Sequence, residues 1–321
     1  MASVIEQWAD KIRNGDVRAI SRAITAIENR DPQSEELFQL IFPYTGHAYI
    51  VGVTGAPGTG KSTMVDRLAA YYRQLGEQIG IIAVDPTSPY TGGAILGDRI
   101  RMQGHASDAG IFIRSMATRG FLGGLTHATA DVALVLDAAG KKYVLIETVG
   151  VGQDEIDIVR LADCTLVVLV PGFGDDIQNM KAGLMEIADI FVLNKTDREG
   201  ADRLEAQLQA MIEMAPERDG WKPQIVRTVA TEGKGIDEVA NAIAQFRERF
   251  AQSTQRHLER VEHWKRRLLG MAGVFLQRVI SDAHGDAALN ALALEVAERR
   301  KDPYAAVREL MARAEITRNT L

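Results

Sequence analysis

The chain has 321 residues, of which 46% are apolar, so it is long enough for one large α/β domain with helical extensions or for two domains. Its formal net charge of -6 gives no support for nucleic-acid binding, and no nucleic-acid partner is expected. The single cysteine, Cys164, rules out an intrachain disulfide framework and suits a reducing cytoplasm.

Residues 1–45 are predicted to form an N-terminal helical arm. Ile5, Trp8 and Ile12 share one helical face, "NGD" interrupts the pattern, and helical spacing resumes at Val17. The opening "MASVIEQWADKIRNGD" contains acidic residues and lacks the layout of a secretory signal or a transit peptide. No apolar run approaches the roughly 18 residues that a transmembrane helix needs. We therefore expect a cytoplasmic protein without a membrane partner.

Residues 46–250 are predicted to form an α/β domain with a mostly parallel central sheet. Short runs rich in Val and Ile alternate with longer amphipathic stretches, a pattern typical of parallel strands covered by helices on both faces. Ligands of such sheets bind at the carboxyl ends of the strands. The predicted strands are "AYIVGV" (48–53), "IGIIAVD" (79–85), "IFIRSM" (111–116), "YVLIET" (143–148), "CTLVVLV" (164–170), "DIFVLN" (189–194) and "QIVRTV" (224–229).

A phosphate-binding P-loop is predicted directly after the first strand. The stretch "GAPGTGKS" matches GxxxxGK[ST], with a strand before it and a helical stretch after it. Glycines let backbone N–H groups point at phosphate oxygens, and the helix start adds its positive dipole end. Lys61 would bring a catalytic positive charge to the β- and γ-phosphates, and Ser62 a hydroxyl to Mg²⁺. The predicted nucleotide contacts are Gly55, Ala56, Pro57, Gly58, Thr59, Gly60, Lys61, Ser62 and Thr63.

Two aspartates in "AVDPTSPYTGGAILGDRIRM" are candidate ligands of Mg²⁺ or of its water. Asp85 ends the second predicted strand, and Asp98 lies in a Gly-rich segment. Aspartate is also a frequent turn former and helix cap, so a structural role is the alternative for each.

The strand "YVLIET" leads into a segment that resembles the DxxG switch motif of GTPases. Glu147 stands in place of the aspartate and would act on Mg²⁺, while Gly150 would donate an N–H to the γ-phosphate. In Ras-like proteins a glutamine after this glycine orients the attacking water, whereas Val151 stands here. We therefore expect slow hydrolysis by the protein alone. The structural alternative is an exposed strand-end acid and a turn glycine.

A Gly-rich loop, "PGFGDDIQNMKAG" (171–183), follows another strand end. Lys181 in this loop could reach the phosphates and act as a catalytic group. The alternative is an ordinary solvated helix lysine.

The segment "NKTD" at the end of the sixth strand resembles the NKxD motif that selects guanine. Asp197 would accept from N1–H and the 2-amino group of guanine, and adenine offers neither donor. Lys195 can lay its methylenes over the base, and Asn194 would tie this segment to the P-loop. A surface turn is the alternative. The last base-contacting loop is expected at Val229, Ala230 and Thr231, where GTPases usually carry Ser-Ala.

Residues 251–321 are predicted to form a C-terminal helical arm. Leu258, Val261, Leu268, Met271, Phe275 and Val279 mark one apolar stripe of a long helix. Such a stripe packs either on its own domain or on a second copy, and we expect a homodimer.

Together these motifs resemble the methylmalonyl-CoA mutase-associated GTPases of the MeaB or ArgK type. The resemblance spans about residues 10–320, and its main departure is Val229 in the base loop. It rests on "GVTGAPGTGKST", "AVDPTSPYTGGAILGDRIRM", "ATRGFLGGL", "ETVGVGQDE", "GFGDDIQNMKAGLMEIAD" and "NKTD".

The resemblance implies a homodimeric GTPase that uses GTP, GDP and Mg²⁺. It further implies a chaperone that binds an adenosylcobalamin-dependent acyl-CoA mutase, gates the loading of its cofactor and protects it. One alternative is a metal-insertion GTPase, which would need a Cys/His site that one cysteine and scattered histidines do not suggest. Another is a P-loop kinase or ATPase linked to amino-acid transport, which would need an acceptor pocket and a base. A purely structural dimer would not need the nucleotide motifs.

Overall fold

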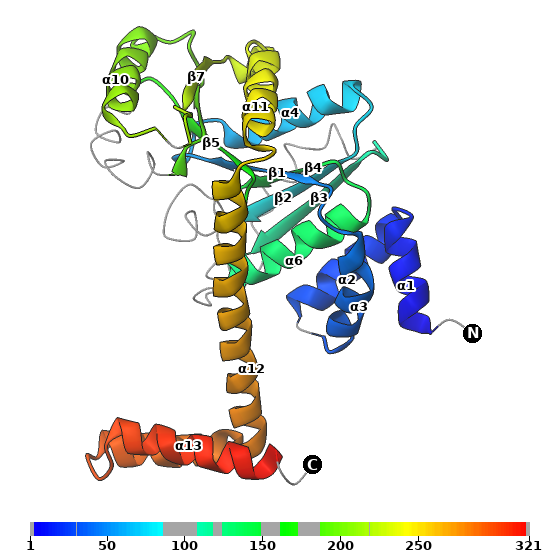
Figure 1. The fold of residues 1–321 in the computed structure, drawn as a ribbon, viewed down its shortest axis with the longest axis vertical. Coiled ribbons are helices and arrows are strands. Elements are labelled where there is room, and N and C mark those ends of the chain that lie inside the picture. Colours follow the sequence, from blue (N-terminus) through cyan, green and yellow to red (C-terminus); the bar gives the residue numbers. More distant parts are fainter. Residues whose placement is uncertain are drawn as a thin grey trace. The chain divides into compact units, whose positions relative to one another are not determined.

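The computed structural model of the chain describes residues 3–29, 31–85, 108–117, 124–148, 161–172, 187–217 and 219–318. The chain divides into two compact units, Met1–Ser253 and Thr254–Leu321, and each is described by itself. Figure 1 labels most of the helices and strands of both units.

A sheet of seven strands forms the centre of the first unit, in the order β3-β2-β4-β1-β5-β6-β7. Each pair of neighbouring strands in this sheet is parallel. The strands are β1 (Tyr49–Thr54), β2 (Ile79–Asp85), β3 (Ile111–Ala117), β4 (Tyr143–Glu147), β5 (Cys164–Leu169), β6 (Ile190–Leu193) and β7 (Gln224–Arg227). The predicted parallel α/β fold is confirmed.

Helices cover both faces of this sheet because its strands are apolar on both sides. One face packs against α4 (Lys61–Gln74) and α11 (Ile236–Phe250), with Val51, Leu145 and Val168 in the shared core. The other packs against α6 (Gly124–Ala138) and the N-terminal helices over part of its width, and α10 (Ala201–Met214) over the rest. Figure 1 shows α4 and α11 on the side of the sheet opposite to α6.

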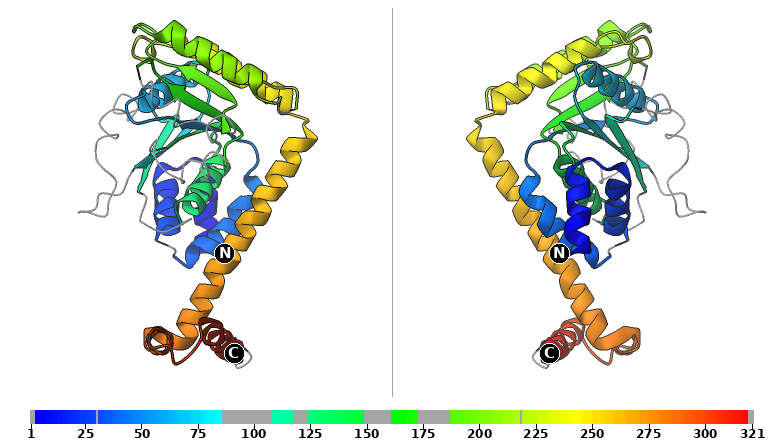
Figure 2. Two further views of the ribbon diagram at one scale, coloured as in Figure 1. Left: turned by 90° about the vertical axis from the view of Figure 1, so that its left-hand side faces the viewer. Right: turned by 90° about the vertical axis from the view of Figure 1, so that its right-hand side faces the viewer.

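The N-terminal helices belong to the first unit and contribute to its core. They are α1 (Val4–Arg13), α2 (Val17–Glu28) and α3 (Gln33–Ile41), followed by the short helix η1 (Phe42–Tyr44). Ile12 and Ile20 are fully buried, and the Trp8 indole donates to the Ala19 carbonyl at 3.0 Å. Val17 begins α2 and is 55% exposed, so it does not share the buried face. Figure 2 shows these helices beside α6.

Aspartates fasten the amino ends of several strands. Asp137 accepts backbone N–H groups of residues 46–48, Asp163 accepts that of Ile50, and Asp189 accepts that of Thr165. Each carboxylate therefore gives a partner to backbone N–H groups before or near the start of a strand. These contacts fix the edge of the sheet opposite to the carboxyl ends, where a ligand is expected.

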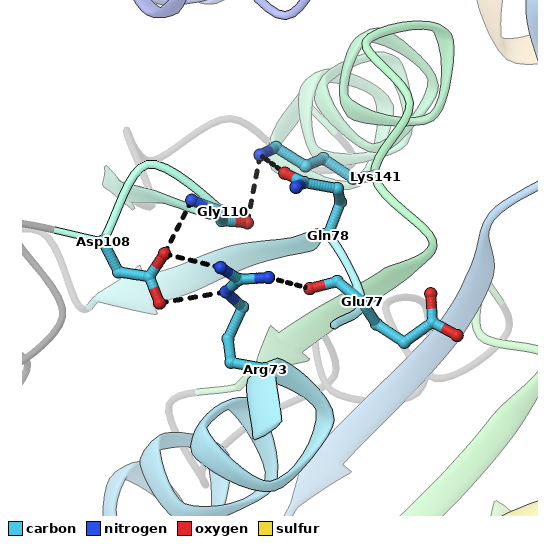
Figure 3. Close-up of polar contacts among 6 residues, drawn as sticks. All are labelled: Arg73, Glu77, Gln78, Asp108, Gly110 and Lys141. Atoms are coloured by element: carbon cyan, nitrogen blue, oxygen red, sulfur yellow. Dashed lines mark hydrogen bonds and ion pairs between the residues drawn. The ribbon is translucent and has the colours of Figure 1, made fainter. Parts of the chain in front are cut away.

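A second cluster on the same side fixes the start of β3. Arg73 donates to both carboxylate oxygens of Asp108 at 2.9 Å and to the Glu77 carbonyl at 2.7 Å. The Lys141 ammonium donates to Gln78 at 3.2 Å and to the Gly110 carbonyl at 3.1 Å (Figure 3). A Cβ at Gly110 would lie 2.1 Å from the Arg73 guanidinium carbon, so a larger residue there would displace the Arg73 side chain.

The second unit consists of the long helix α12 (Thr254–Ala297) and α13 (Pro303–Arg318). Lys301 lies between them and pairs with Glu295 and Glu309, each at 2.7 Å. These ion pairs join the end of α12 to α13. None of the helices in the described part of the chain has the length and apolar character needed to cross a membrane.

Candidate functional site

The carboxyl ends of β1, β4, β6 and β7 bring four sequence motifs to one edge of the sheet. The P-loop follows β1, Glu147 ends β4, "NKTD" follows β6, and the 229–231 loop follows β7. Because all these strands are parallel, segments far apart in the chain meet here.

Three P-loop glycines have backbone conformations or close contacts that other residues would not tolerate. Gly55 has φ 142°, and a Cβ there would lie 2.3 Å from the Val168 carbonyl oxygen. Gly60 has φ 97°, and its Cβ would lie 2.4 Å from the Asn194 amide nitrogen. Gly58 also has a positive φ, 82°. These glycines let the P-loop turn tightly, and a tight turn of this kind can direct its backbone N–H groups toward one bound phosphate.

Lys61 begins α4 and directs its charge into the P-loop. It is 6% exposed, and its ammonium donates to the carbonyls of Gly55 at 2.8 Å and Ala56 at 3.1 Å. Gly60 precedes the helix without a side-chain cap. The first N–H groups of α4 and the Lys61 charge are therefore both suited to bind phosphate.

Ser62 and Glu147 meet although they are far apart in the chain. The Ser62 hydroxyl donates to Glu147 Oε1 at 2.6 Å, and Glu147 is 5% exposed. Beside them, Thr148 donates to Thr54 at 2.9 Å, which joins the ends of β4 and β1. A hydroxyl and a carboxylate are oxygen ligands that suit Mg²⁺, whose remaining ligands are phosphate oxygens and water. The residues present therefore fit a nucleotide-bound Mg²⁺.

Asn194 joins two loops through one buried amide. Its Nδ2 donates to the Thr59 carbonyl of the P-loop at 2.9 Å. Its Oδ1 accepts from Thr228 Oγ1 at 3.1 Å and from the Ala230 N–H at 3.0 Å. Asn194 is 2% exposed, so these bonds are shielded from water. The P-loop and the 229–231 loop are thus held together through one side chain.

Lys195 and Asp197 lie on the outer side of this junction. Lys195 has φ 58°, and its ammonium donates to the Gly58 carbonyl at 2.7 Å, so its side chain reaches the P-loop. Asp197 is exposed. The pKa of Lys234 is raised mainly by its hydrogen bond to Glu232 and in small part by Asp197. Asp197 and Lys234 therefore lie near one another beside the 229–231 loop.

The 229–231 loop is anchored by a residue that the sequence did not single out. Val229 donates its N–H to the Lys234 carbonyl at 3.1 Å, and residues 230–232 form the short helix η3 (Ala230–Glu232). Arg67 on α4 donates to the carbonyls of Ala230 at 3.1 Å and Thr231 at 3.0 Å. No motif marks Arg67, because an exposed arginine in an amphipathic helix is an ordinary sequence feature.

Several predicted site residues cannot be placed by this structure. Gly150, Asp98 and Lys181 lie outside the described residues. Asp85 ends β2, but only its backbone is described. In the ranges that are described, no group of three or more His, Cys, Asp and Glu side chains could hold a metal ion.

Comparison with known families and proteins gives a consistent result. The chain matches the family model of the methylmalonyl Co-A mutase-associated GTPase MeaB over residues 20–283. A Pyrococcus abyssi protein with a provisional GTPase name is 46% identical over 310 residues, 94% of each chain. GTPase ArgK of Escherichia coli is 39% identical over 246 residues, 74% of each chain. A mitochondrial methylmalonic aciduria type A homolog of Caenorhabditis elegans is 30% identical over 281 residues, 82% of this chain and 70% of the relative.

A solved structure shares the same overall architecture. The crystal structure of an LAO/AO transport system kinase has a TM-score of 0.71 and 25% identity to this chain. It covers 97% of this chain and 98% of its own.

Proposed function

Because the chain belongs to the methylmalonyl Co-A mutase-associated GTPase family MeaB, we propose that it is a GTP-hydrolysing chaperone of an adenosylcobalamin-dependent acyl-CoA mutase. The mutase is methylmalonyl-CoA mutase or a close relative. The GTPase gates the loading of the mutase cofactor and protects the mutase from inactivation. The observation that carries this proposal is the family match over residues 20–283, which include all the nucleotide motifs.

Guanine is selected at the outer side of the Asn194 junction. The Asp197 carboxylate accepts from N1–H and the 2-amino group, which adenine does not offer. Lys195 covers one face of the base with its methylenes while its ammonium bonds the P-loop. A backbone N–H of the 229–231 loop meets the 6-oxo group. Asn194 holds these parts and the P-loop in one arrangement.

The phosphates are bound by the P-loop, where Lys61 supplies charge to the β- and γ-phosphates. Ser62 and Glu147 hold Mg²⁺, directly or through water, and Asp85 and Asp98 are further proposed ligands. Bound there, Mg²⁺ would supply positive charge that offsets the negative charge on the phosphates during hydrolysis. Gly150 donates to the γ-phosphate, and Lys181 approaches it in the mutase complex.

Hydrolysis by the protein alone is slow, because Val151 stands where Ras-like proteins carry the glutamine that orients water. A partner that orders the segments around Gly150 and Lys181 raises the rate. Ordering of a segment around the γ-phosphate is a common way to couple hydrolysis to a partner. The mutase is the partner that the family name supports.

The proposed assembly is a homodimer of a cytoplasmic protein. Its three parts are the N-terminal arm 1–45, the GTPase domain 46–250 and the dimerisation arm 251–321. Support comes from α12, where Leu268, Met271 and Phe275 are between 51% and 63% exposed in the single chain. Large apolar side chains repeated along one helix are typical of an interface between copies.

Single-turnover hydrolysis at saturating GTP tests the proposal, with and without a B12-dependent acyl-CoA mutase from the same source. We expect the mutase to raise the rate at least about tenfold, which corresponds to roughly 1.4 kcal/mol of barrier. Lys181→Ala should lose much of that stimulation and keep the GTP affinity, whereas Lys222→Ala, an exposed lysine elsewhere, should behave as wild type. An unchanged rate across a full titration, with binding confirmed separately, contradicts the coupling. Stimulation that survives Lys181→Ala contradicts only the role of that lysine.

A kinase linked to amino-acid transport is the second candidate, because the solved structure with the same architecture is named an LAO/AO transport system kinase. The same single-turnover reaction separates the two. Release of all the γ-phosphate as inorganic phosphate supports the GTPase, and its transfer to an amino-acid transport component supports the kinase.

A further inference from the structure

We propose that Arg67 is a positioning residue for guanine recognition, which holds the 229–231 loop so that it distinguishes the 6-oxo group of GTP. This inference rests on the proposed binding of GTP at this site. It assigns a part of base selection to the helix that begins at the P-loop.

Arg67 bridges α4 and the base loop. Its Nε donates to the Ala230 carbonyl at 3.1 Å, and its Nη2 donates to the Thr231 carbonyl at 3.0 Å. A guanidinium presents these donors in one rigid plane, so two neighbouring carbonyls are held in a fixed relation to it. A lysine has no such fork and would hold the loop less firmly.

The Ala230 backbone is held from two directions. Its N–H donates to Asn194 Oδ1 on the inner side, and its carbonyl accepts from Arg67 on the outer side. Asn194 also donates a hydrogen bond to the P-loop, and Arg67 lies on α4, the helix that follows the P-loop. The loop is therefore positioned against the phosphate-binding end of the same site.

The Arg67 bond also acts on the donor that faces the base. The N–H groups of Val229 and Ala230 already donate to Lys234 and Asn194. Within the described residues this leaves the Thr231 N–H as the donor of the loop for the 6-oxo group. That N–H and the Ala230 carbonyl belong to one peptide group, so a charged donor on the carbonyl polarises the N–H and strengthens its hydrogen bond.

The position of Arg67 makes it suitable for substitution. Arg67 is exposed, whereas its helix neighbour Leu68 is fully buried in the core. Truncation of Arg67 therefore removes contacts to the loop and leaves the core of α4 intact. Arg18, an exposed arginine of α2, offers a matched control on the opposite face of the sheet.

The experiment compares GTP with two analogues by calorimetry in the wild type and in Arg67→Ala, Arg67→Lys and Arg18→Ala. In 6-thio-GTP sulfur replaces the 6-oxygen and N1–H is kept, and inosine triphosphate lacks only the 2-amino group. The wild type should prefer GTP over both analogues. In Arg67→Ala the preference over 6-thio-GTP should fall about fivefold, a typical effect of one hydrogen bond. The preference for GTP over inosine triphosphate should be unchanged, because Asp197 and not Arg67 recognises the 2-amino group.

The outcomes separate this inference from the proposed function. The preference of Arg67→Lys for GTP over 6-thio-GTP should be close to that of Arg67→Ala. The preference of Arg18→Ala should match that of the wild type. An unchanged 6-thio-GTP preference in Arg67→Ala overturns the role of Arg67, as does an equal loss of both preferences, which indicates a general defect. A wild type without preference for GTP over 6-thio-GTP also overturns it. A wild type that binds ATP as well as GTP contradicts the proposed function itself.

Discussion

Asn194 shows how a single side chain can organise a site made of distant segments. Its amide bonds the P-loop through Thr59 and the base loop through Ala230 and Thr228. These partners follow the carboxyl ends of β1 and β7, which are separated in the sheet by β5 and β6. The amide has the donor and acceptor needed to join loops that offer a carbonyl on one side and an N–H on the other.

Asp197→Asn should weaken GTP binding strongly and improve the binding of xanthosine triphosphate. The amide presents a donor where guanine also has donors, and xanthine has an oxygen at that position. Asp197 is exposed, so the substitution should not disturb folding. Calorimetric titration of the purified variant with both nucleotides measures this exchange of preference.

Asp202→Asn, an exposed aspartate of α10 with its own partner Arg227, is the control and should bind both nucleotides as the wild type does. Equal affinities of Asp197→Asn and wild type for both nucleotides would contradict the assigned role.

At the scale of elements, the start of β3 depends on a cluster of charged residues from α4 and from the segments before β2 and β4 (Figure 3). Lys141 is 6% exposed, and burial, followed by the nearby Arg73, lowers its pKa below the usual 10.5. Asp108 opposes this shift in part. The charged ammonium is therefore less favourable in the folded chain than in the unfolded chain.

The pH dependence of unfolding should reveal this lysine. Between its lowered pKa and 10.5 the unfolded state binds more protons at this residue, so Lys141 makes stability rise with pH. Below the lowered pKa, both states are protonated and the contribution is constant. Urea titrations measure the unfolding free energy of the wild type and of Lys141→Met. The value for the wild type minus the value for Lys141→Met should increase with pH across this alkaline window.

Lys142→Met changes the neighbouring exposed lysine. Its unfolding free energy should depend on pH with the same slope as that of the wild type. A Lys141→Met variant whose stability runs parallel to the wild type at every pH would show that the pKa of Lys141 is not lowered.

At the scale of the whole molecule, the proposed dimer depends on the apolar stripe of α12. Phe275 and Leu268 are 63% and 59% exposed in the single chain, and both are in the unit Thr254–Leu321. Burial of large apolar side chains contributes about 1.5–3 kcal/mol each, so covering several of them can stabilise a dimer.

Phe275→Glu should shift the protein toward monomer in sedimentation velocity at micromolar concentration. A charge in an apolar interface is unfavourable unless it finds a partner. Leu75→Glu, at an exposed position that follows α4 in the first unit, is the control and should sediment as the wild type does. A wild-type chain that sediments as a monomer would refute the dimer.

The fold was predictable because its information is local. The strands are near-continuous apolar runs between helical stretches, and all seven predicted strands are present. The P-loop could be recognised from spacing alone, because its glycines occupy positions whose local backbone conformation favours glycine, such as the positive φ of Gly60. The exposure of Val17 was not predictable from periodicity, because the first residue of a helix can lie beyond the packed area.

By itself, the sequence determined the parallel α/β architecture, the order of the nucleotide motifs and the family to which the chain belongs. Only the tertiary structure decided which side chains meet. Ser62 contacts Glu147, and Arg67 holds the carbonyls of Ala230 and Thr231. The bond from Asn194 to the P-loop was expected from the sequence, and the structure adds its bond to Ala230. The physical reason is that strand order and register set these distances, and parallel pairing between strands distant in the chain leaves no periodic signal around the individual residues.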